Sequence, residues 1–396
     1  MYRAWSWVAV ALLVLVTPAA AEICSRDDVP AATLLLPYFE VDLGNPNGVT
    51  TLFSVNNAFS DPVVAKVEIW SDLGVGLGGF NIYLDGFDVQ SINLRDILNC
   101  QLPNTPPPAG SPFSASCAGA FPQPAQLCSV TTYQTALTGK PVPSLSGCAG
   151  VDHGDNIARG YVTVDVVNGC TTQYPGNSGY FAPGGTGVAS NRNALWGDSF
   201  YVNPSQNLTD GEMLVHIEAS GTNNETSLAG QYTFYGKFVG WTGRDNREPL
   251  PSTYGVRFLN GGPFSGGTSL RVWRDSKVNQ GAFKCGFAPS WYPLGQESIF
   301  VFDEQAHSAS ASGLKPFPAV AQRVQVAGAQ LPVPYTFGWL VLGLDNTVPA
   351  AGSNPPEDPS RAQAWVGVEM DSQGRYSAGF NAMHYDNACT GVTPSP

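Results

Sequence analysis

Apolar and polar residues alternate in short runs along most of the chain, and glycine and proline separate these runs. Val67 and Ile69, for example, alternate with the charged residues Lys66 and Glu68. A period of two residues is that of a β-strand with one buried face. The runs are rich in valine, isoleucine, tyrosine, phenylalanine and threonine. This pattern predicts an all-β protein in which antiparallel sheets pack as a sandwich.

The clearest strand candidates are residues 33–39, 50–56, 63–70, 81–84, 90–94, 161–167, 213–219, 231–239, 256–259, 270–274, 298–302, 322–326, 337–344, 362–370 and 376–385. The last two candidates flank a short polar segment that ends in Gly374. Glycine suits the positive φ that tight turns require, so we expect these two strands to form a hairpin.

Two stretches of the chain share one order of residues. Each runs from a strand through an asparagine and a Phe-Ser turn into a strand that ends in Trp-x-Asp; the stretches are residues 51–72 and 253–275. We interpret the first as a β-hairpin with residues 57–62 as its turn. Such features are common to many hairpins, so two readings stay open: one large sandwich, or two related sandwich units.

The second reading divides the chain into an N-terminal domain at residues 22–245 and a C-terminal domain at residues 246–396. In both stretches the tryptophan, Trp70 or Trp273, follows an apolar residue that faces the other way. An outward tryptophan indicates a second packing layer or a contact surface.

Residues 101–150 differ from the rest because they are rich in proline, glycine, serine and cysteine. We interpret them as an insertion in the N-terminal domain. Within it, residues 124–138 are compatible with one short helix, since Gly139 and Pro141 follow as ordinary helix-stop signals.

The first 21 residues have the parts of a secretory signal: Arg3, an apolar run, and Ala19, Ala20 and Ala21 before the expected cleavage site. The apolar run is shorter than the roughly 20 residues that span a bilayer. We therefore expect a secreted protein, whether extracellular, periplasmic or on the cell surface, with no membrane span after the signal is removed.

All eight cysteines follow the expected cleavage site, which predicts disulfides in an exported chain. Spacing favours Cys148 with Cys170, on either side of one strand, and Cys285 with Cys389, which would hold the C-terminus. Other pairings stay open at this point.

The net charge of the chain narrows the classes of molecule that the protein is expected to bind. The formal net charge is −12, and charged residues form 13% of the chain, against about 25% in typical proteins. An acidic chain without a basic stripe repels phosphate backbones, so we expect no nucleic-acid binding.

Chemistry-bearing residues form no complete catalytic motif. No two histidines have metal-ligand spacing, and no G-x-S-x-G elbow occurs. His216 and Glu218 alternate in one predicted strand and face the same side, as a binding pair or an ordinary polar face. Asp152, Asp155 and Asn156 form an oxygen-rich loop, a weak calcium candidate. No cofactor is expected.

Aromatic residues are the better candidates for recognition. Trp196 and Trp241 lie beside glycine and polar turn residues, and Trp70 faces outward from its strand. A rigid aromatic face stacks on sugar rings or packs against a protein partner. The function predicted is that of a non-catalytic structural or binding protein at the cell exterior, with a polysaccharide or a surface protein as partner. The alternative is an exported glycoside hydrolase with carboxylates on its strands.

Overall fold

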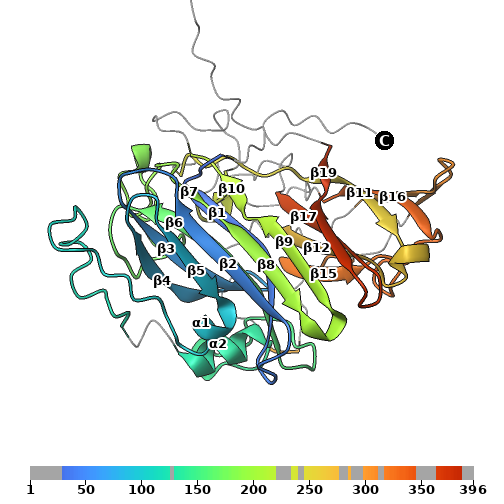
Figure 1. The fold of residues 1–396 in the computed structure, drawn as a ribbon, viewed down its shortest axis with the longest axis horizontal. Coiled ribbons are helices and arrows are strands. Elements are labelled where there is room, and N and C mark those ends of the chain that lie inside the picture. The colour runs from blue at the N-terminus through green and yellow to red at the C-terminus, as the bar shows by residue number, and fades with distance from the viewer. Residues whose placement is uncertain are drawn as a thin grey trace, which may run out of the picture.

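The computed structural model describes residues 29–124, 129–219, 233–239, 245–275, 284–286, 298–310, 316–344 and 363–385. The expected signal peptide lies outside these ranges. None of the helices within them has the length and hydrophobicity that crossing a bilayer requires. Four antiparallel sheets dominate the structure, which confirms the all-β, sandwich-like fold class (Figure 1).

Two of the sheets pack face to face as the first sandwich. One has the order β10-β1-β6-β3-β4, and the other has the order β5-β2-β8-β9 with β7 also paired to β2. Their bounds are β1 Thr33–Asp42, β2 Thr50–Asn57, β3 Val63–Ser71, β4 Gly76–Leu84, β5 Val89–Asn93, β6 Ile157–Val167, β7 Leu195–Trp196, β8 Asp198–Asn203, β9 Leu208–Met213 and β10 Val215–Ile217. Leu34, Phe53 and Val67 contribute to the core between these sheets.

The other two sheets form the second sandwich. They have the orders β14-β13-β16-β11-β19 and β15-β12-β17-β18. The bounds are β11 Thr253–Leu259, β12 Gly267–Arg274, β13 Ser298–Phe302, β14 Ser308–Ser310, β15 Ala321–Gln325, β16 Phe337–Gly343, β17 Ala364–Asp371, β18 Ser377–Asn381 and β19 Met383–His384. Phe258, Val272 and Val366 contribute to its separate core.

The interpretation of residues 51–72 as a β-hairpin is wrong. β2 and β3 belong to different sheets, so the turn between them crosses from one face of the sandwich to the other. Asn57 shapes this turn, because its Nδ2 donates to the carbonyl of Asp61 at 2.8 Å and its Oδ1 accepts from the backbone of Phe59 at 3.1 Å. β11 and β12 are divided between two sheets in the same way.

The repeated stretch belongs to a larger repeat of strand pairing. Strands β2, β3, β4, β5 and β6 correspond in order to β11, β12, β15, β16 and β17. In each set the first strand pairs with the fourth, and the second pairs with the third and the fifth, always antiparallel. The second sandwich adds β13 and β14 between β12 and β15. The two sandwiches therefore share one five-strand arrangement.

Other local predictions have mixed outcomes. β17 and β18 form the expected hairpin, and Gly374 in its turn has a φ of 77°. The predicted helix of the insertion is α2 Val130–Leu137, which Ser129 caps and which ends before Gly139. Helix α1 Leu94–Leu98 was not predicted. The strand predicted at residues 231–239 is wrong where it can be compared, because α3 Gly236–Val239 is helical.

The sandwiches meet through the outward faces of β1, β3, β6 and β10 on one side and β12, β15 and β17 on the other. The interface core consists of Leu35, Tyr38, Trp70, Leu73, Tyr161, Val215, Ile217, Phe234, Tyr235, Leu250, Trp273, Ala319, Val320, Ala321 and Trp365. The backbone also crosses the interface, since the carbonyl of Asp72 accepts from Val320 at 2.9 Å and from Ala321 at 3.0 Å. The outward tryptophans thus face a second packing layer.

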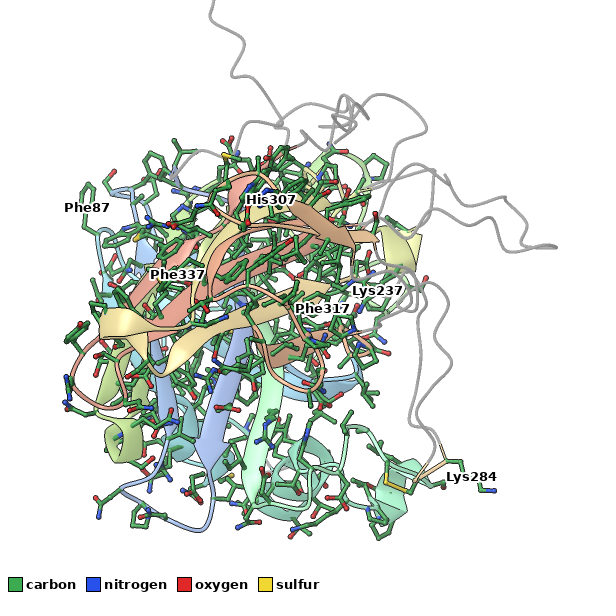
Figure 2. All side chains as sticks on the ribbon, turned by 90° about the vertical axis from the view of Figure 1, so that its right-hand side faces the viewer. Phe87, Lys237, Lys284, His307, Phe317 and Phe337 are labelled. Carbon is green, nitrogen blue, oxygen red and sulfur yellow. A yellow bond between two sulfur atoms is a disulfide. The ribbon has the colours of Figure 1, made fainter. Side chains whose placement is uncertain are left out.

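The predicted disulfide pairs are wrong. Cys148 is bonded to Cys285, and Cys170 is bonded to Cys117; Cys389 lies outside the described residues. The spacing argument failed because the insertion folds back along the sheets and brings distant cysteines together. The bond from Cys148 lies beside Lys284 in Figure 2. Disulfides persist in oxidising compartments, so these two bonds indicate that the protein matures in one.

Candidate functional sites

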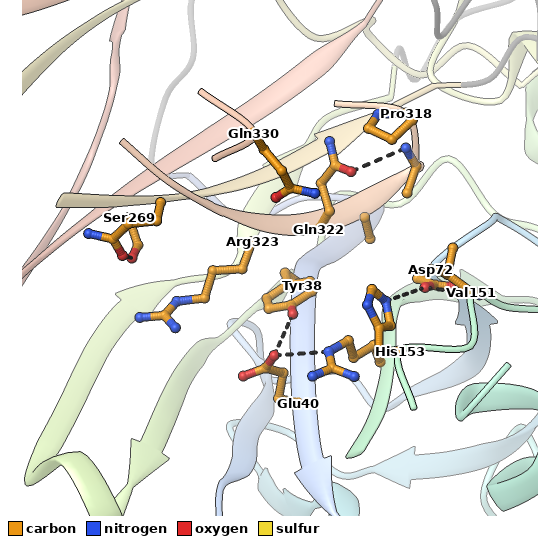
Figure 3. A pocket seen from close by; sticks show the side chains of 14 residues that line it. Tyr38, Glu40, Asp72, Val151, His153, Ser269, Pro318, Gln322, Arg323 and Gln330 are labelled. Carbon is orange, nitrogen blue, oxygen red and sulfur yellow. Dashed lines mark hydrogen bonds and ion pairs between the residues drawn. The ribbon is translucent and has the colours of Figure 1, made fainter. Parts of the chain in front are cut away.

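A cavity of about 390 Å³ lies at the polar end of the interface between the sandwiches, and we call it the interface cavity (Figure 3). Strand alternation creates this site. On β1, Phe39 and Val41 face the first core, so Glu40 faces the second sandwich. On β15, Val324 faces the second core, so Arg323 faces back. The cavity is lined by Tyr38, Glu40, Asp72, Val151, His153, Arg159, Ser269, Pro318, Ala319, Ala321, Gln322, Arg323, Gln325 and Gln330.

Glu40 is the most heavily bonded of these residues. Its Oε1 accepts from the hydroxyl of Tyr38 at 2.7 Å and lies 3.1 Å from Nε of Arg159, and its Oε2 accepts from Tyr201. Burial by itself raises the pKa of a carboxyl. Here the bonds from Tyr201 and Tyr38, together with the charge of Arg159, outweigh burial and hold the pKa of Glu40 below its usual value.

The calcium candidates Asp152, Asp155 and Asn156 all have hydrogen-bond partners within the protein. Asp155 is bound through both oxygens by Arg159 at 2.8 Å, and these hydrogen bonds lower its pKa. Asp152 accepts from the backbone of Gly154 at 2.9 Å, as turn residues do. No cluster of three metal-ligating side chains occurs in the described ranges. Arg159 thus engages the carboxylate of Asp155, and Oδ1 of Asn156 accepts from Nζ of Lys140 at 3.4 Å, so the calcium site in this loop stays a prediction.

Asp72 and His153 form another side-chain pair of the cavity. Oδ2 of the buried Asp72 lies 3.6 Å from Nε2 of His153, which is partly exposed at the cavity wall. Both carboxylate oxygens also accept from the backbone of Val151, at 3.1 and 3.3 Å. Burial is the dominant influence and raises the pKa of Asp72.

The opposite wall belongs to the second sandwich. Arg323 is bonded to Glu369, and Ser269 donates to Oε1 of Gln325 at 2.7 Å. Among the described residues, Nε of Arg323 has no hydrogen-bond partner. Sequence reasoning did not select Glu40, Arg159 or Arg323, since each is an ordinary polar position in an alternating strand.

Arg271 joins the two sandwiches beyond this cavity. Arg271 on β12 is bonded to Asp210 on β9 and lies 3.2 Å from Oε1 of Glu212. The strands approach closely here, because a Cβ at Gly379 would lie 1.6 Å from Oδ1 of Asp210. Only glycine fits at that position of β18. The polar half of the interface is thus held by buried ion pairs.

The first sandwich has a second cavity, of about 430 Å³, at the end of β2, β5 and β7, and we call it the rim cavity. It is lined by Pro30, Asn56, Asn57, Ala58, Phe87, Asp88, Val89, Trp196, Met213 and His216. Two residues selected from the sequence, Trp196 and His216, therefore line the same cavity. The indole of Trp196 is 37% exposed, whereas His216 is buried.

Polar and apolar groups alternate around the rim cavity. Asn56 donates from Nδ2 to Oγ of Ser54 at 2.9 Å and to the carbonyl of Trp196 at 3.2 Å. Its Oδ1 is buried and has no hydrogen-bond partner within the part of the chain that the structure describes. Phe87 is 69% exposed at a φ of 57°, an uncommon conformation for a residue other than glycine. Figure 2 shows Phe87 projecting from the edge of the molecule.

The remaining sequence candidates lie elsewhere. Trp70 is 2% exposed within the interface core, so it is not available to a partner outside the chain, which corrects the prediction for this residue. Trp241 lies outside the described residues. Val215 and Ile217 face the interface core, as the alternation with His216 predicted. Glu218 is not part of the rim cavity; its carbonyl accepts from the backbone of Glu248 at 3.0 Å.

Comparison of the chain with protein-family models, with curated protein sequences and with solved structures finds no match. The chemistry of the two cavities is therefore the basis for a functional conclusion.

Proposed function

We propose that this protein is a secreted or cell-surface, non-catalytic carbohydrate-binding protein, and that the rim cavity holds a sugar ring against Trp196. One observation carries the proposal: an exposed indole lies beside Asn56, whose buried Oδ1 lacks a donor in the described structure. A sugar ring presents both complementary parts, an apolar face for the indole and hydroxyl groups for the acceptor. The two disulfides fit an exported protein.

The shape of the rim cavity supports a small rigid ligand. Trp196, Phe87 and Val89 supply apolar surface, and all three are exposed. Asn56 supplies an amide oxygen, whereas the amide of Asn57 is already bound within the turn after β2. Sites that bind small molecules commonly combine a mostly apolar wall with a few placed polar groups. A protein partner would use the same aromatic surface and is the competing outcome of the test.

The test is binding of the purified chain to a glycan array, followed by affinity electrophoresis with the polysaccharide recognised. Trp196→Ala is expected to weaken binding at least about tenfold, as loss of an aromatic anchor does. Phe380→Ala is the matched control, since Phe380 is a 39% exposed aromatic on β18 of the second sandwich. Binding to no glycan, or equal binding by wild type and Trp196→Ala, would contradict the proposal.

The alternative function, glycoside hydrolysis, has one observation in its favour. Glu40 on β1 and Asp72 after β3 line one cavity, and their pKa values are shifted in opposite directions. Such divergence can separate an acid from a base. However, three protein donors already occupy both oxygens of Glu40. We therefore prefer the binding role. Release of reducing sugar that is lost in Asp72→Asn would reverse this preference.

A further inference from the structure

The interface cavity is independent of the rim cavity and has a different character. Residues from both sandwiches form its walls, so it exists only where the two are joined. Its volume of about 390 Å³ lies within the usual range of small-molecule sites, roughly 300–1,000 Å³. Charged and amide side chains dominate the lining, whereas aromatic and aliphatic groups dominate the rim cavity.

The acceptor groups of this cavity are already engaged. Glu40 accepts from Tyr38, Tyr201 and Arg159. Asp72 accepts from the backbone of Val151 and faces His153. The amide oxygen of Gln325 accepts from Ser269. Because these oxygens have protein donors, a ligand gains little by offering further donors to them.

The donor groups of Arg159, Gln322 and Gln325 are also engaged by protein acceptors, so the spare donor capacity of this cavity lies in Arg323 and Gln330. Arg323 is bonded through Nη2 to Glu369, but its Nε is buried without a partner among the described residues. The side chain of Arg323 is 23% exposed, and an anionic oxygen on its exposed part would add a charge-assisted bond, which is about twice as strong as a neutral one. Gln330 lies exposed on the same wall, and His153 lies across from it (Figure 3).

We propose that the interface cavity binds a small carboxylated sugar, with its carboxylate on Arg323 and a hydroxyl group on the exposed amide of Gln330 on the same wall. A uronic acid has the required combination of one carboxylate and several hydroxyl groups on a single ring. The ligand contacts both sandwiches, since Arg159 and His153 belong to the first and Arg323 and Gln330 to the second. Bound ligand therefore stabilises their association.

The first experiment compares two sugars that differ at one group. Isothermal titration of the full chain with D-glucuronate is expected to give saturable binding, and D-glucose is expected to bind at least about tenfold more weakly, because it lacks the charge-assisted bond. D-glucuronate is also expected to raise the unfolding temperature. Equal binding of the two sugars, or no binding of D-glucuronate, would overturn the proposal.

The second experiment places a like charge at the cavity wall. Gln330→Glu changes shape very little at an exposed position and is expected to weaken D-glucuronate binding about tenfold through repulsion. Gln101→Glu adds the same charge at an exposed site that does not line the cavity, and is expected to bind as wild type does. Equal binding by the two variants would also overturn the proposal.

Arginine chemistry gives a further check. Arg323→Lys keeps the charge but removes the fork of donors, so it should retain weak binding, whereas Arg323→Gln should abolish it. Unfolding temperatures of both variants show whether the fold is preserved. Trp196→Ala is expected to keep full affinity for D-glucuronate, which separates this proposal from the function proposed for the rim cavity.

Discussion

Trp70 on β3 and Trp273 on β12 hold matching positions in the two sandwiches and meet at one residue, Tyr161. The ring of Trp70 stacks on Tyr161 with centroids 5.7 Å apart, and Trp273 contacts the same ring edge-on at 6.0 Å. Each tryptophan is the next-to-last residue of its strand and pairs across the sheet with an aromatic residue, Tyr161 or Trp365. The shared strand arrangement thus places two equivalent residues in the interface.

The first prediction concerns this aromatic contact. Trp273→Ala removes a buried side chain that also stacks on Phe234 at 5.5 Å. Truncation of a buried tryptophan leaves a cavity, so the free energy of unfolding should fall by about 3–5 kcal/mol. Guanidinium denaturation measures this change. Phe380→Ala, at an exposed site, should change the same quantity by no more than about 0.5 kcal/mol. A loss for Trp273→Ala that is as small as the loss for Phe380→Ala would show that the interface core does not stabilise the protein.

The second prediction concerns Glu40. Glu40→Gln removes the charge that pairs with Arg159 in a buried setting, and should cost about 3 kcal/mol at neutral pH. The pKa of Glu40 lies below its usual value of 4.5, so the stabilisation is present above pH 4.5 and is lost as the pH falls through the depressed pKa. The difference in the free energy of unfolding between wild type and Glu40→Gln should therefore shrink in acid. Denaturation curves across this range measure it.

Tyr38→Phe is the matched control for that measurement. It removes one hydrogen bond to Glu40 and no charge, so it should cost about 1 kcal/mol. A difference between wild type and Glu40→Gln that grows in acid would contradict the assignment of Glu40 as an ionised, buried anchor.

The third prediction concerns Asp245, whose contribution to stability should depend on pH in the opposite direction to that of Glu40. Burial raises the pKa of Asp245 from 3.8 to about 6, although Arg247 opposes the shift. A carboxyl with a raised pKa favours the folded state most below pH 3.8, and this contribution is lost as the pH rises through 6. The stability of wild type relative to Asp245→Asn should therefore fall by about 2 kcal/mol between pH 4 and pH 7. Urea denaturation at each pH tests this, and a constant difference would contradict it.

The alternation of apolar and polar residues predicted most strands of the two sandwiches, but it did not predict which strands pair with each other. The five residues between β2 and β3 can join neighbours in one sheet or cross to another, and the pattern of side chains is the same in both cases. The charged positions of β3 illustrate the limit. Lys66 and Glu68 look solvent-facing in sequence, yet both are buried beneath a second layer and lie 3.4 Å apart. Strands β7, β8 and β9 were missed in part because β7 has only two residues and the apolar residues of β8 are consecutive, while β9 has only Leu208 and Met213 as apolar residues.

The candidate sites were predictable only where a single residue carried the signal. Trp196 stands before a glycine in a polar context, and the structure places it partly exposed. The interface cavity gave no such signal, because Glu40 and Arg323 are far apart in the chain and meet only after both sandwiches have formed. Long-range pairing of this kind follows from sheet order, which local periodicity does not encode. The disulfide prediction failed for the same reason.

The last prediction concerns disulfide connectivity. Proteolytic digestion without reduction, followed by mass spectrometry, should recover one linked peptide pair that contains Cys148 and Cys285, and another that contains Cys117 and Cys170. The first bond joins residues 137 positions apart and restricts a long loop of the unfolded chain. Its removal in the double variant Cys148→Ser, Cys285→Ser should therefore lower the free energy of unfolding by about 4–5 kcal/mol.

The double variant Cys117→Ser, Cys170→Ser is the comparison, since its bond spans 53 positions. The loop-entropy argument predicts a slightly smaller loss for it, about 4 kcal/mol. The two bonds also differ in what they join. Cys117–Cys170 holds the insertion to the segment after β6, whereas Cys148–Cys285 ties the insertion to the segment between β12 and β13. Loss of Cys148–Cys285 should thus weaken D-glucuronate binding at the interface cavity, and loss of Cys117–Cys170 should not. Recovery of a Cys148–Cys170 peptide would contradict this connectivity.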